Sequence, residues 1–422
     1  MPGAVTSVTP TASAPPGQPD IAYVPDYDKW QARAARRLKE GNLPKTLPEG
    51  YPAQLTGAMV WEGETVGDTY DWTYVLSDEQ LAEIDRALEY FQGLGLALGH
   101  ISAVTFPLPT LGAELRRLSA ELHGGHGFFV VRGIRVDART RAENVAIYVG
   151  LSAQVAPQRG RQDNKHGGVA ADVVLGHIKN LSGPAAAAVG SPAYTADKQV
   201  FHTDSGDILA LFALETSAAA GASKLASTWR VYNEIAATRP DLVHTLSHNW
   251  AMEDSFKETK KQYIERPLLH HLPATTTAPE RIELQYGRRY FVGFGALPRR
   301  PTIPPITEAQ AEALDALHFL SERFCVNTGF RKGDIQYINN LALLHARDGF
   351  TDTPEKTRHL LRLWLRDPEY AWLIPQAWEY RWEQLYGGVT PEKQVLPLEP
   401  FIRSAGNKAK QRPREGRKGA RK

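Results

Sequence analysis

The sequence predicts a mainly β protein with added helices, built as a β-sandwich or a jelly-roll barrel. From Gly127 onward, apolar runs of strand length recur between turns, at residues 127–134, 171–178, 200–214, 281–295, 334–350 and 358–366. Helical patterns lie among them, including residues 229–246 and 306–324. Many short strands mixed with turns and a few helices, without a repeat of fixed period, are typical of sandwiches and jelly rolls.

The first part of the chain is expected to be helical. Residues 28–41 have a helical composition, and residues 77–91 place apolar side chains at helical spacing behind a capping box of Ser77 and Gln80. Residues 109–125 carry a stripe of leucines and finish in two glycines, a common helix end. These patterns predict a helical cap ahead of the strands.

Four segments are expected along the chain. Residues 1–25 are rich in Pro, Ala, Ser and Thr, which predicts disorder. Residues 26–125 are expected to form an N-terminal arm and helical cap packed on the barrel, and residues 126–402 the β domain itself. Residues 403–422 are expected to be a disordered basic tail.

The tail accounts for the net charge. Residues 403–422 hold nine Lys or Arg residues and one Glu, so the rest of the chain is net acidic although the whole chain carries +2. Such a tail fits either a solvated end or a contact with nucleic acid. Because the body has no basic stripe with interleaved aromatics, nucleic acid is not the expected partner.

The composition also indicates a compartment. The single cysteine, Cys325, excludes an intramolecular disulfide and fits a reducing environment. The first residues have neither the basic start nor the apolar core of a secretory signal, and no run reaches the roughly 18 apolar residues of a membrane helix. We expect a cytoplasmic protein with no membrane partner, and the sequence gives no indication of its oligomeric state.

Polar residues in the run 200–214 point to a metal site. His202 and Asp204 are two positions apart, so on one strand they share a face. An imidazole and a carboxylate on an apolar sheet are costly to bury unless a partner such as a divalent metal neutralises them. His345 follows another strand-like run and is the best candidate for a third ligand. Two histidines and one carboxylate on one face of iron leave positions open for oxygen and a co-substrate.

Two arginines strengthen this interpretation. Arg358 and Arg362 are four positions apart in the apolar run 358–366, so both point to one side of a strand. Arginine in such a place favours a carboxylate that it binds with two hydrogen bonds. A metal beside a carboxylate clamp fits a dicarboxylate that chelates iron at one end, and 2-oxoglutarate is such a molecule.

These segments resemble a known family. The stretches FHTDSGD, GDIQYINNLALLHARDGF and RHLLRLWL are similar to the fungal branch of the TauD/TfdA (taurine and 2,4-D dioxygenase) family, and the resemblance extends over roughly residues 45–375. It implies a distorted double-stranded β-helix, a jelly roll of the clavaminate synthase-like type, as the catalytic domain. It also implies an Fe(II)- and 2-oxoglutarate-dependent dioxygenase that consumes O2.

The resemblance assigns roles around the metal. It implies His202, Asp204 and His345 as iron ligands. Asn340 falls just before the distal ligand at a family asparagine position, where it is expected to orient groups around the metal.

The resemblance also assigns roles around the ligands. Arg358 is expected to grip the distal carboxylate of 2-oxoglutarate, with Ser223 in place of the family's threonine, although Ala220 and Ala222 replace the neighbouring Gly and Asp. Arg362 matches a position that contacts the acidic group of the primary substrate; a second grip on 2-oxoglutarate or a structural ion pair is the alternative.

Two further side chains have competing interpretations. His177 either contacts substrate or is a structural histidine satisfied by backbone groups, and Trp364 is expected to pack in the core or at the rim.

The expected activity is oxidation of a C–H bond in a small organic acid, sulfonate or amino acid, with hydroxylation as the default. Oxidative cyclisation or desaturation of an amino-acid-like precursor in fungal secondary metabolism is the alternative, because one iron site serves both outcomes. An inactive metal-bearing binding protein is a second alternative. The complete ligand set together with Arg358 argues against it.

Overall fold

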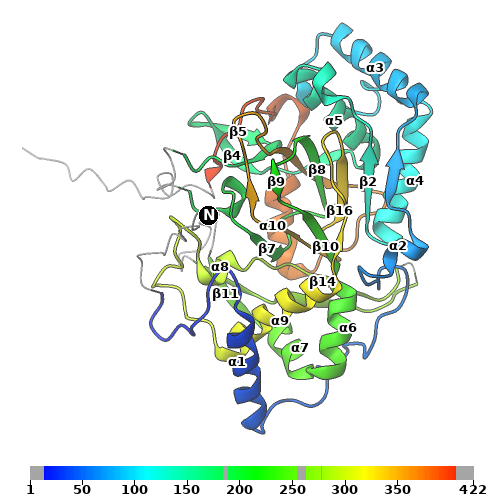
Figure 1. Cartoon of the computed structure of the whole chain (residues 1–422). Coiled ribbons are helices and arrows are strands. Elements are labelled where there is room, and N and C mark those ends of the chain that lie inside the picture. Colours follow the sequence, from blue (N-terminus) through cyan, green and yellow to red (C-terminus); the bar gives the residue numbers. More distant parts are fainter. Residues whose placement is uncertain (1–13, 184–188, 254–262, 277, 405–422) are drawn as a thin grey trace, which may run out of the picture.

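Two antiparallel sheets form the centre of the molecule in the computed structural model, which describes residues 14–183, 189–253, 263–276 and 278–404 (Figure 1). The larger sheet has the strand order β1 (Thr73–Val75), β2 (Phe128–Arg132), β16 (Ile335–Asn339), β8 (Ile208–Glu215), β19 (His359–Arg366) and β3 (Gln158–Arg159), with β6 (Gly176–Lys179) also on β19. The smaller has the order β15 (Val326–Asn327), β10 (Ser223–Ser227), β17 (Leu343–Arg347) and β7 (Gln199–His202). Within these two sheets only the pair β1 and β2 is parallel. This is the predicted jelly-roll class.

Smaller ladders flank the two sheets. They are β20 (Gln394–Val395), β5 (Val169–Val173) and β4 (Asp163–His166); β11 (Trp250–Glu253) with β12 (Tyr263–Arg266); β13 (Leu269–Leu272) with β14 (Arg281–Leu284); and β18 (Phe350–Thr351) with β9 (Ala219–Ala220).

Helices pack on two sides of the sheets (Figure 1). One group is α3 (Asp78–Gly93), α4 (Leu111–Gly124) and α5 (Arg141–Val155), beside β2. The other is α1 (Tyr27–Lys39), α6 (Thr228–Thr238), α7 (Pro240–Ser247) and α9 (Glu308–Phe324). The remaining α-helices are α2 (Val66–Thr69), α8 (Arg289–Val292) and α10 (Gln376–Tyr386). Residues 26–125 thus do not form one cap, because α1 packs on α9 while α3 and α4 lie with α5.

The alternation of side chains along β19 separates the core from the site. Leu361, Leu363 and Leu365 are fully buried in the apolar cluster that contains α3, α4 and α5. Arg362 and Trp364 therefore point to the opposite face, as the period of two in a strand requires. The polar chemistry of β19 is confined to that face.

The prediction of a single strand over 200–214 is wrong. β7 ends at His202 in the smaller sheet, and β8 begins at Ile208 in the larger one, so the chain crosses between the sheets in a five-residue turn. Gly206 in this turn has φ +90°, and a Cβ there would lie 2.6 Å from the Tyr386 hydroxyl, so a larger residue does not fit. His202 and Asp204 come together because of this turn and not because they share a strand face.

Two other expectations are corrected locally, and a third is confirmed. Residues 281–295 are not one strand: β14 ends at Leu284 and Arg289–Val292 is the short helix α8. Residues 229–246 are two helices, α6 and α7, because Pro240 begins the second and lacks the N–H that a continuous helix needs. The helix predicted behind Ser77 is present as α3 with its capping box.

The ends of the chain take part in the fold. In the segment expected to be disordered, the Gln18 amide donates to the Phe291 carbonyl at 2.9 Å. At the other end, Arg403 and Ser404 contact the barrel, whereas residues 405–422 lie outside the described residues. No helix in the described part of the chain is long and apolar enough to cross a membrane.

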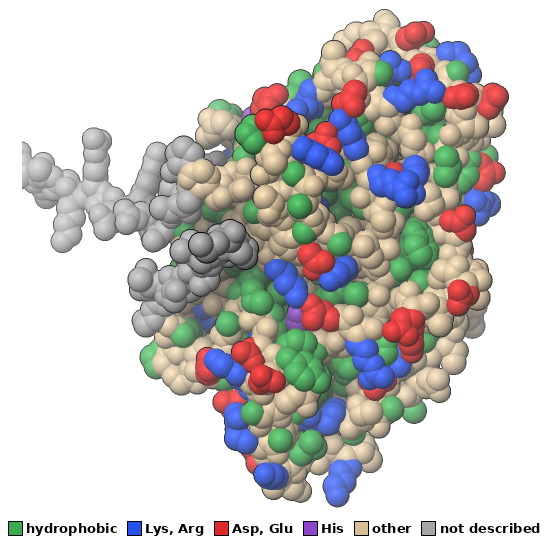
Figure 2. All heavy atoms as spheres, in the orientation of Figure 1, with side chains coloured by type: hydrophobic (Ala, Val, Ile, Leu, Met, Phe, Trp, Pro, Cys, Tyr) green, Lys and Arg blue, Asp and Glu red, His purple; other side chains and the backbone are tan. Residues whose placement is uncertain are grey.

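Acidic and basic side chains are mixed on the molecular face drawn in Figure 2, without a continuous basic stripe.

Candidate active site

Two histidines and one aspartate converge where the two sheets meet. β7 and β17 pair antiparallel with His202 opposite His345, and their ring centres are 4.1 Å apart. Asp204 lies in the turn after β7, with its Oδ1 3.9 Å from His202 Nε2. One ligand atom from each residue lies within 4.8 Å of the others. The two sheets and the turn between them thus present a set of donors for one ion.

Both imidazoles are suited to bind a metal as neutral ligands. His202 Nδ1 lies 2.9 Å from the Val200 carbonyl, so this nitrogen carries the proton and Nε2 offers its lone pair beside Asp204. Burial lowers the pKa of His202, and burial together with the neighbouring His202 lowers the pKa of His345. Nδ1 of His345 is buried without a hydrogen-bond partner. The chemistry of these donors fits iron(II).

Two donors fix the orientation of the Asp204 carboxylate. Oδ2 accepts hydrogen bonds from Arg362 Nη1 at 2.7 Å and Trp364 Nε1 at 3.1 Å, which leaves Oδ1 on the side of the histidines. Burial acts to raise the pKa of Asp204, but Arg362, the two histidines and Trp364 outweigh it, and the pKa is lowered. Asp204 is therefore ionised, with Oδ2 held by two donors and Oδ1 available to bind an ion.

Asn340 positions the turn that carries Asp204. Its Oδ1 accepts from the Asp204 backbone N–H at 2.8 Å, and its Nδ2 donates to the carbonyls of Asp204 and Gly206 at 2.7 and 2.8 Å. Asn340 itself is fully buried at the end of β16. Asn340, at the end of a strand of the larger sheet, thereby fixes the position of Asp204, which lies in the turn between the two sheets.

A small cavity beside the ligands contains an unpaired buried arginine. The cavity, about 40 Å³, is lined by Asp204 and His345 and by Ser223, Arg358 and Arg362 among others. No carboxylate of the described residues is within ion-pair distance of the Arg358 guanidinium, and its Nη1 is buried without a partner. Burial and the neighbouring Arg347 lower the pKa of Arg358 to about 9. A bound carboxylate would supply the missing counter-charge.

Ser223 lies on the same cavity. Its hydroxyl donates to Gln336 Oε1 at 3.2 Å, and both Ser223 and Arg358 also line an adjoining cavity of about 410 Å³. A wider space therefore continues outward from the buried arginine. We name the 40 Å³ space the Arg358 cavity.

A second cavity opens on the other side of the ligands. It measures about 80 Å³ and is lined by His202, Asp204 and Arg362, and by Tyr23, Arg289 and Arg403 among others. We name it the Arg403 cavity. Both cavities share Gln199, Asp204 and Arg362. The site thus has two compartments that meet at the Asp204–Arg362 pair.

Sequence reasoning missed three residues here. Gln199 Nε2 lies 3.0 Å from His202 Nε2, the nitrogen offered to the metal, but a glutamine in a strand gives no sequence signal. Trp364 was expected only to pack, yet it donates to Asp204; its spacing of two from Arg362 was an available signal. Arg403 was assigned to the tail because its neighbours are basic.

The structure does not bring His177 to the site. Its Nδ1 lies 2.8 Å from His359 Nε2 and its Nε2 lies 2.8 Å from the Pro397 carbonyl, and only 1% of the residue is exposed. Because β6 pairs with the far part of β19, both ring nitrogens are used inside the protein. The structural interpretation of His177 replaces the expected substrate contact.

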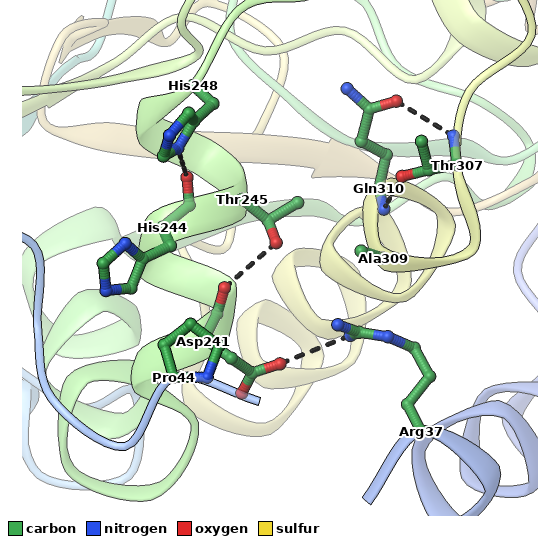
Figure 3. Close-up of a pocket in the computed structure, with 9 residues that line it drawn as sticks. All are labelled: Arg37, Pro44, Asp241, His244, Thr245, His248, Thr307, Ala309 and Gln310. Atoms are coloured by element: carbon green, nitrogen blue, oxygen red, sulfur yellow. Dashed lines mark hydrogen bonds and ion pairs between the residues drawn. The ribbon is translucent and has the colours of Figure 1, made fainter. Parts of the chain in front are cut away.

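A larger cavity, about 270 Å³, lies between α1, α7 and the start of α9 (Figure 3). Figure 3 shows its polar groups engaged with one another: Asp241 with Arg37, Thr245 with the Asp241 carbonyl and His248 with the His244 carbonyl. It contains none of the three ligands. The candidate ligands line the two smaller cavities instead.

A double-stranded β-helix that brings two histidines and one aspartate to a point is the architecture of non-haem iron oxygenases. Comparison with known proteins identifies the group within this class. The model of the family described as "Taurine catabolism dioxygenase TauD, TfdA family" matches residues 91–364, and the chain belongs to this family.

Individual relatives agree with this membership. The taurine hydroxylase-like protein SAT17 of Stachybotrys chartarum is 34% identical over 373 residues, which cover 86% of this chain and 93% of the relative. FR-33289 synthase of Streptomyces rubellomurinus is 24% identical over 325 residues, covering 74% and 90%. An asparagine oxygenase crystallised with Fe(II), 2S,3S-3-hydroxyasparagine and succinate has the same fold, with a TM-score of 0.52 at 14% identity over 70% of this chain and 94% of that one.

Family membership confirms the predicted enzyme class. The chain is a dioxygenase, and iron(II), 2-oxoglutarate and O2 are its cofactor and co-substrates.

Proposed function

We propose that the enzyme hydroxylates a C–H bond of a small organic acid, sulfonate or amino acid, with His202, Asp204 and His345 as the iron ligands. One observation carries this proposal: the three donors lie within 4.8 Å of one another, directly beside a buried guanidinium that has no carboxylate partner. Iron bound there supplies the activation of O2, coupled to oxidative decarboxylation of 2-oxoglutarate.

The Arg358 cavity is the proposed site of 2-oxoglutarate. Arg358 would bind the distal carboxylate, which balances its unpaired charge, and the Ser223 hydroxyl would turn from Gln336 to donate to the same group. Asp204 and His345 line this cavity, so the other end of the co-substrate lies toward the metal ligands.

The Arg403 cavity is the proposed site of the primary substrate. Arg362 lines it and keeps Nη2 buried without a partner while Nη1 holds Asp204. An acidic group on the substrate would satisfy Nη2, so Arg362 has two roles, orienting the ligand and binding the substrate. The relative named as taurine hydroxylase-like supports an acidic substrate, and the asparagine oxygenase of similar fold is consistent with an amino acid.

The remaining residues hold the geometry. Val200 fixes the tautomer of His202, Asn340 fixes the backbone of Asp204, and Trp364 fixes its side chain. Apolar side chains also line the Arg358 cavity, those of Ile178, Leu211 and Leu360 among them, and help to keep bulk water away.

The experiment is a single turnover. Full-length protein is loaded with iron(II) and 2-oxoglutarate under nitrogen and mixed with a panel of amino acids and sulfonates, and O2 is then admitted. We expect one equivalent of succinate and a product with one added oxygen atom. The variant His345→Ala, which lacks one ligand, is expected to release no succinate. Succinate release that His345→Ala leaves unchanged would refute the assigned site.

The same experiment separates the alternatives. A product that has lost two hydrogen atoms would replace hydroxylation by desaturation or ring closure. Protein that binds iron and 2-oxoglutarate but never yields succinate would be the inactive binding protein.

A further inference from the structure

Arg403 reaches the Arg403 cavity from the last described stretch of the chain. Its Nε and its backbone N–H both donate to the Tyr194 hydroxyl, at 3.1 and 3.2 Å, and its Nη1 donates to the Gln162 carbonyl at 3.3 Å. The backbone N–H of Ser404 donates to Asp163 Oδ2 at 2.7 Å. Four hydrogen bonds therefore anchor this end of the chain on the barrel and hold the guanidinium in place.

Arg403 and Arg362 lie on the same aromatic ring. The guanidinium carbon of Arg362 is 4.9 Å from the Trp364 ring centre, and that of Arg403 is 5.3 Å from it. Burial, and after it the charge of Arg403, lowers the pKa of Arg362. Two like charges held this close favour a ligand of opposite charge between or beside them.

The charges that line this cavity do not balance. Of the described residues, one carboxylate lines it, that of Asp204, together with four arginines, Arg288, Arg289, Arg362 and Arg403. Arg362 is paired with Asp204, and Arg288 is paired with a carboxylate outside the cavity. Among the described residues, no carboxylate is within ion-pair distance of Arg289 or Arg403. The guanidiniums of Arg289 and Arg403 therefore lack a direct carboxylate contact, although Asp204 and Asp163 act on Arg403 from farther away.

We propose that Arg403, with Arg362, forms the anion subsite for the primary substrate, and that the substrate carries a doubly charged oxyanion of the phosphonate or phosphate class. The inference rests on the proposed function only in assigning this cavity to the primary substrate. Arg403 is then a specificity-determining residue, because its charge distinguishes a dianion from a monoanion of the same shape.

The test measures anion binding without iron. Methylphosphonate, at a pH above its second ionisation, and methanesulfonate, which has the same shape and one charge fewer, are titrated calorimetrically into metal-free full-length protein. We expect wild type to bind methylphosphonate more tightly than methanesulfonate and Arg403→Gln to bind methylphosphonate about tenfold more weakly, the size of one charge-assisted hydrogen bond. The control Arg36→Gln, at an exposed arginine far from both cavities, is expected to stay within about twofold of wild type.

Methylphosphonate affinity that is unchanged in Arg403→Gln would overturn the proposal. Equal affinity of wild type for the two probes would refute the doubly charged class. If Arg403→Gln fails to fold, Tyr194→Phe is tested in its place. This variant keeps the Arg403 charge but removes the hydroxyl that anchors the Arg403 guanidinium. An intermediate loss of about threefold supports the subsite and no loss refutes it.

Failure here is distinct from failure of the proposed function. The titration needs neither iron nor turnover, whereas the succinate assay needs both. A protein that binds methylphosphonate through Arg403 but releases no succinate would keep the subsite and refute the oxygenase.

Discussion

The helical layer and the barrel each group four arginines, and they satisfy them differently. The helical arginine cluster, where α1, α7 and α9 meet, consists of Arg33, Arg37, Arg239 and Arg288. Each of these contacts a carboxylate, and the carboxylates are those of Asp241, Glu308, Glu312 and Asp315. Four positive and four negative charges make this cluster neutral by itself.

The barrel arginine cluster consists of Arg347, Arg358, Arg362 and Arg403. Arg362 alone among them contacts a carboxylate within the described residues, and that carboxylate belongs to Asp204, a proposed metal ligand. Arg347 donates to the backbone carbonyls of Thr195 and Asp197, and Arg403 to the Tyr194 hydroxyl and the Gln162 carbonyl. Contact with a protein carboxylate thus distinguishes the arginines that stabilise the fold from those that we propose bind a ligand.

The largest expected effect is loss of stability in the helical arginine cluster. Glu312 is fully buried and contacts both Arg37 and Arg239, so Glu312→Gln removes one of the two carboxylates that these guanidiniums share and leaves only Asp241. We expect the free energy of unfolding to fall by about 3–5 kcal/mol in urea titrations, with the KM for 2-oxoglutarate unchanged. The control Asp78→Asn, which removes an exposed partner of Arg135, should cost less than about 1 kcal/mol. Equal losses in both variants would contradict the comparison.

Glu283 is a buried acidic residue without a hydrogen-bond partner among the described residues, and it is the acidic counterpart of the unpaired arginines. Glu283 is fully buried, neither of its carboxyl oxygens has a hydrogen-bond partner, and burial raises its pKa from 4.5 to about 8. Between these values the unfolded chain ionises and the folded protein does not, so stability is complete below about pH 4.5 and falls as the pH rises toward 8. Glu283→Gln should lack this fall, which is on the order of 3 kcal/mol between pH 5 and 8. Urea unfolding at four pH values measures it, with the exposed Glu379→Gln as control; parallel pH curves for wild type and Glu283→Gln would contradict it.

Removing an unpaired arginine should affect binding and spare the fold. Arg358→Gln is expected to raise the KM for 2-oxoglutarate about 100-fold, because the two charge-assisted hydrogen bonds of the clamp are lost. Its free energy of unfolding should stay the same or rise, since an uncompensated buried cation is removed. Steady-state kinetics and urea titration test both statements, and a destabilisation like that of Glu312→Gln would place Arg358 with the structural arginines.

Arg362 both contacts a carboxylate and faces a cavity. Variants of Arg362 and of its neighbour Trp364 are expected to show the smallest effects. Arg362→Gln removes the donor that holds Asp204 Oδ2 and should weaken iron(II) binding about tenfold in anaerobic equilibrium dialysis. Trp364→Phe removes only the longer hydrogen bond and should weaken it about threefold. A rise in substrate KM at unchanged iron affinity would show that Arg362 serves the substrate alone.

The sequence was sufficient for the strands whose apolar pattern is long, and less so where polar residues interrupt it. β2, β16 and β19 lie inside the predicted runs, and the capping box at Ser77 located α3. The turn between β7 and β8 escaped prediction because its flanking residues alternate as one strand would, and only pairing in two different sheets divides them.

At the site, the sequence predicted the residues whose chemical type indicates a role, and it missed those whose role depends on their neighbours in the fold. His202, Asp204 and His345 are found together since a buried imidazole and carboxylate need a shared partner. Arg403 was missed because charge composition describes a segment on average, whereas its role depends on one hydroxyl, that of Tyr194, placed by a distant loop. The two interpretations of His177 could not be separated because a strand sequence does not show which neighbouring groups its side chain meets, here His359 and the Pro397 carbonyl.

The crossover at residues 203–207 has a consequence for the lifetime of the enzyme. His202 and His345 belong to the smaller sheet, and Asp204 is held by Asn340 at the end of the larger one. An ion bound by these three side chains would therefore link the two sheets at the point where the chain passes between them. Iron-loaded enzyme should for this reason resist proteolysis longer than chelator-treated enzyme, even before any substrate is present.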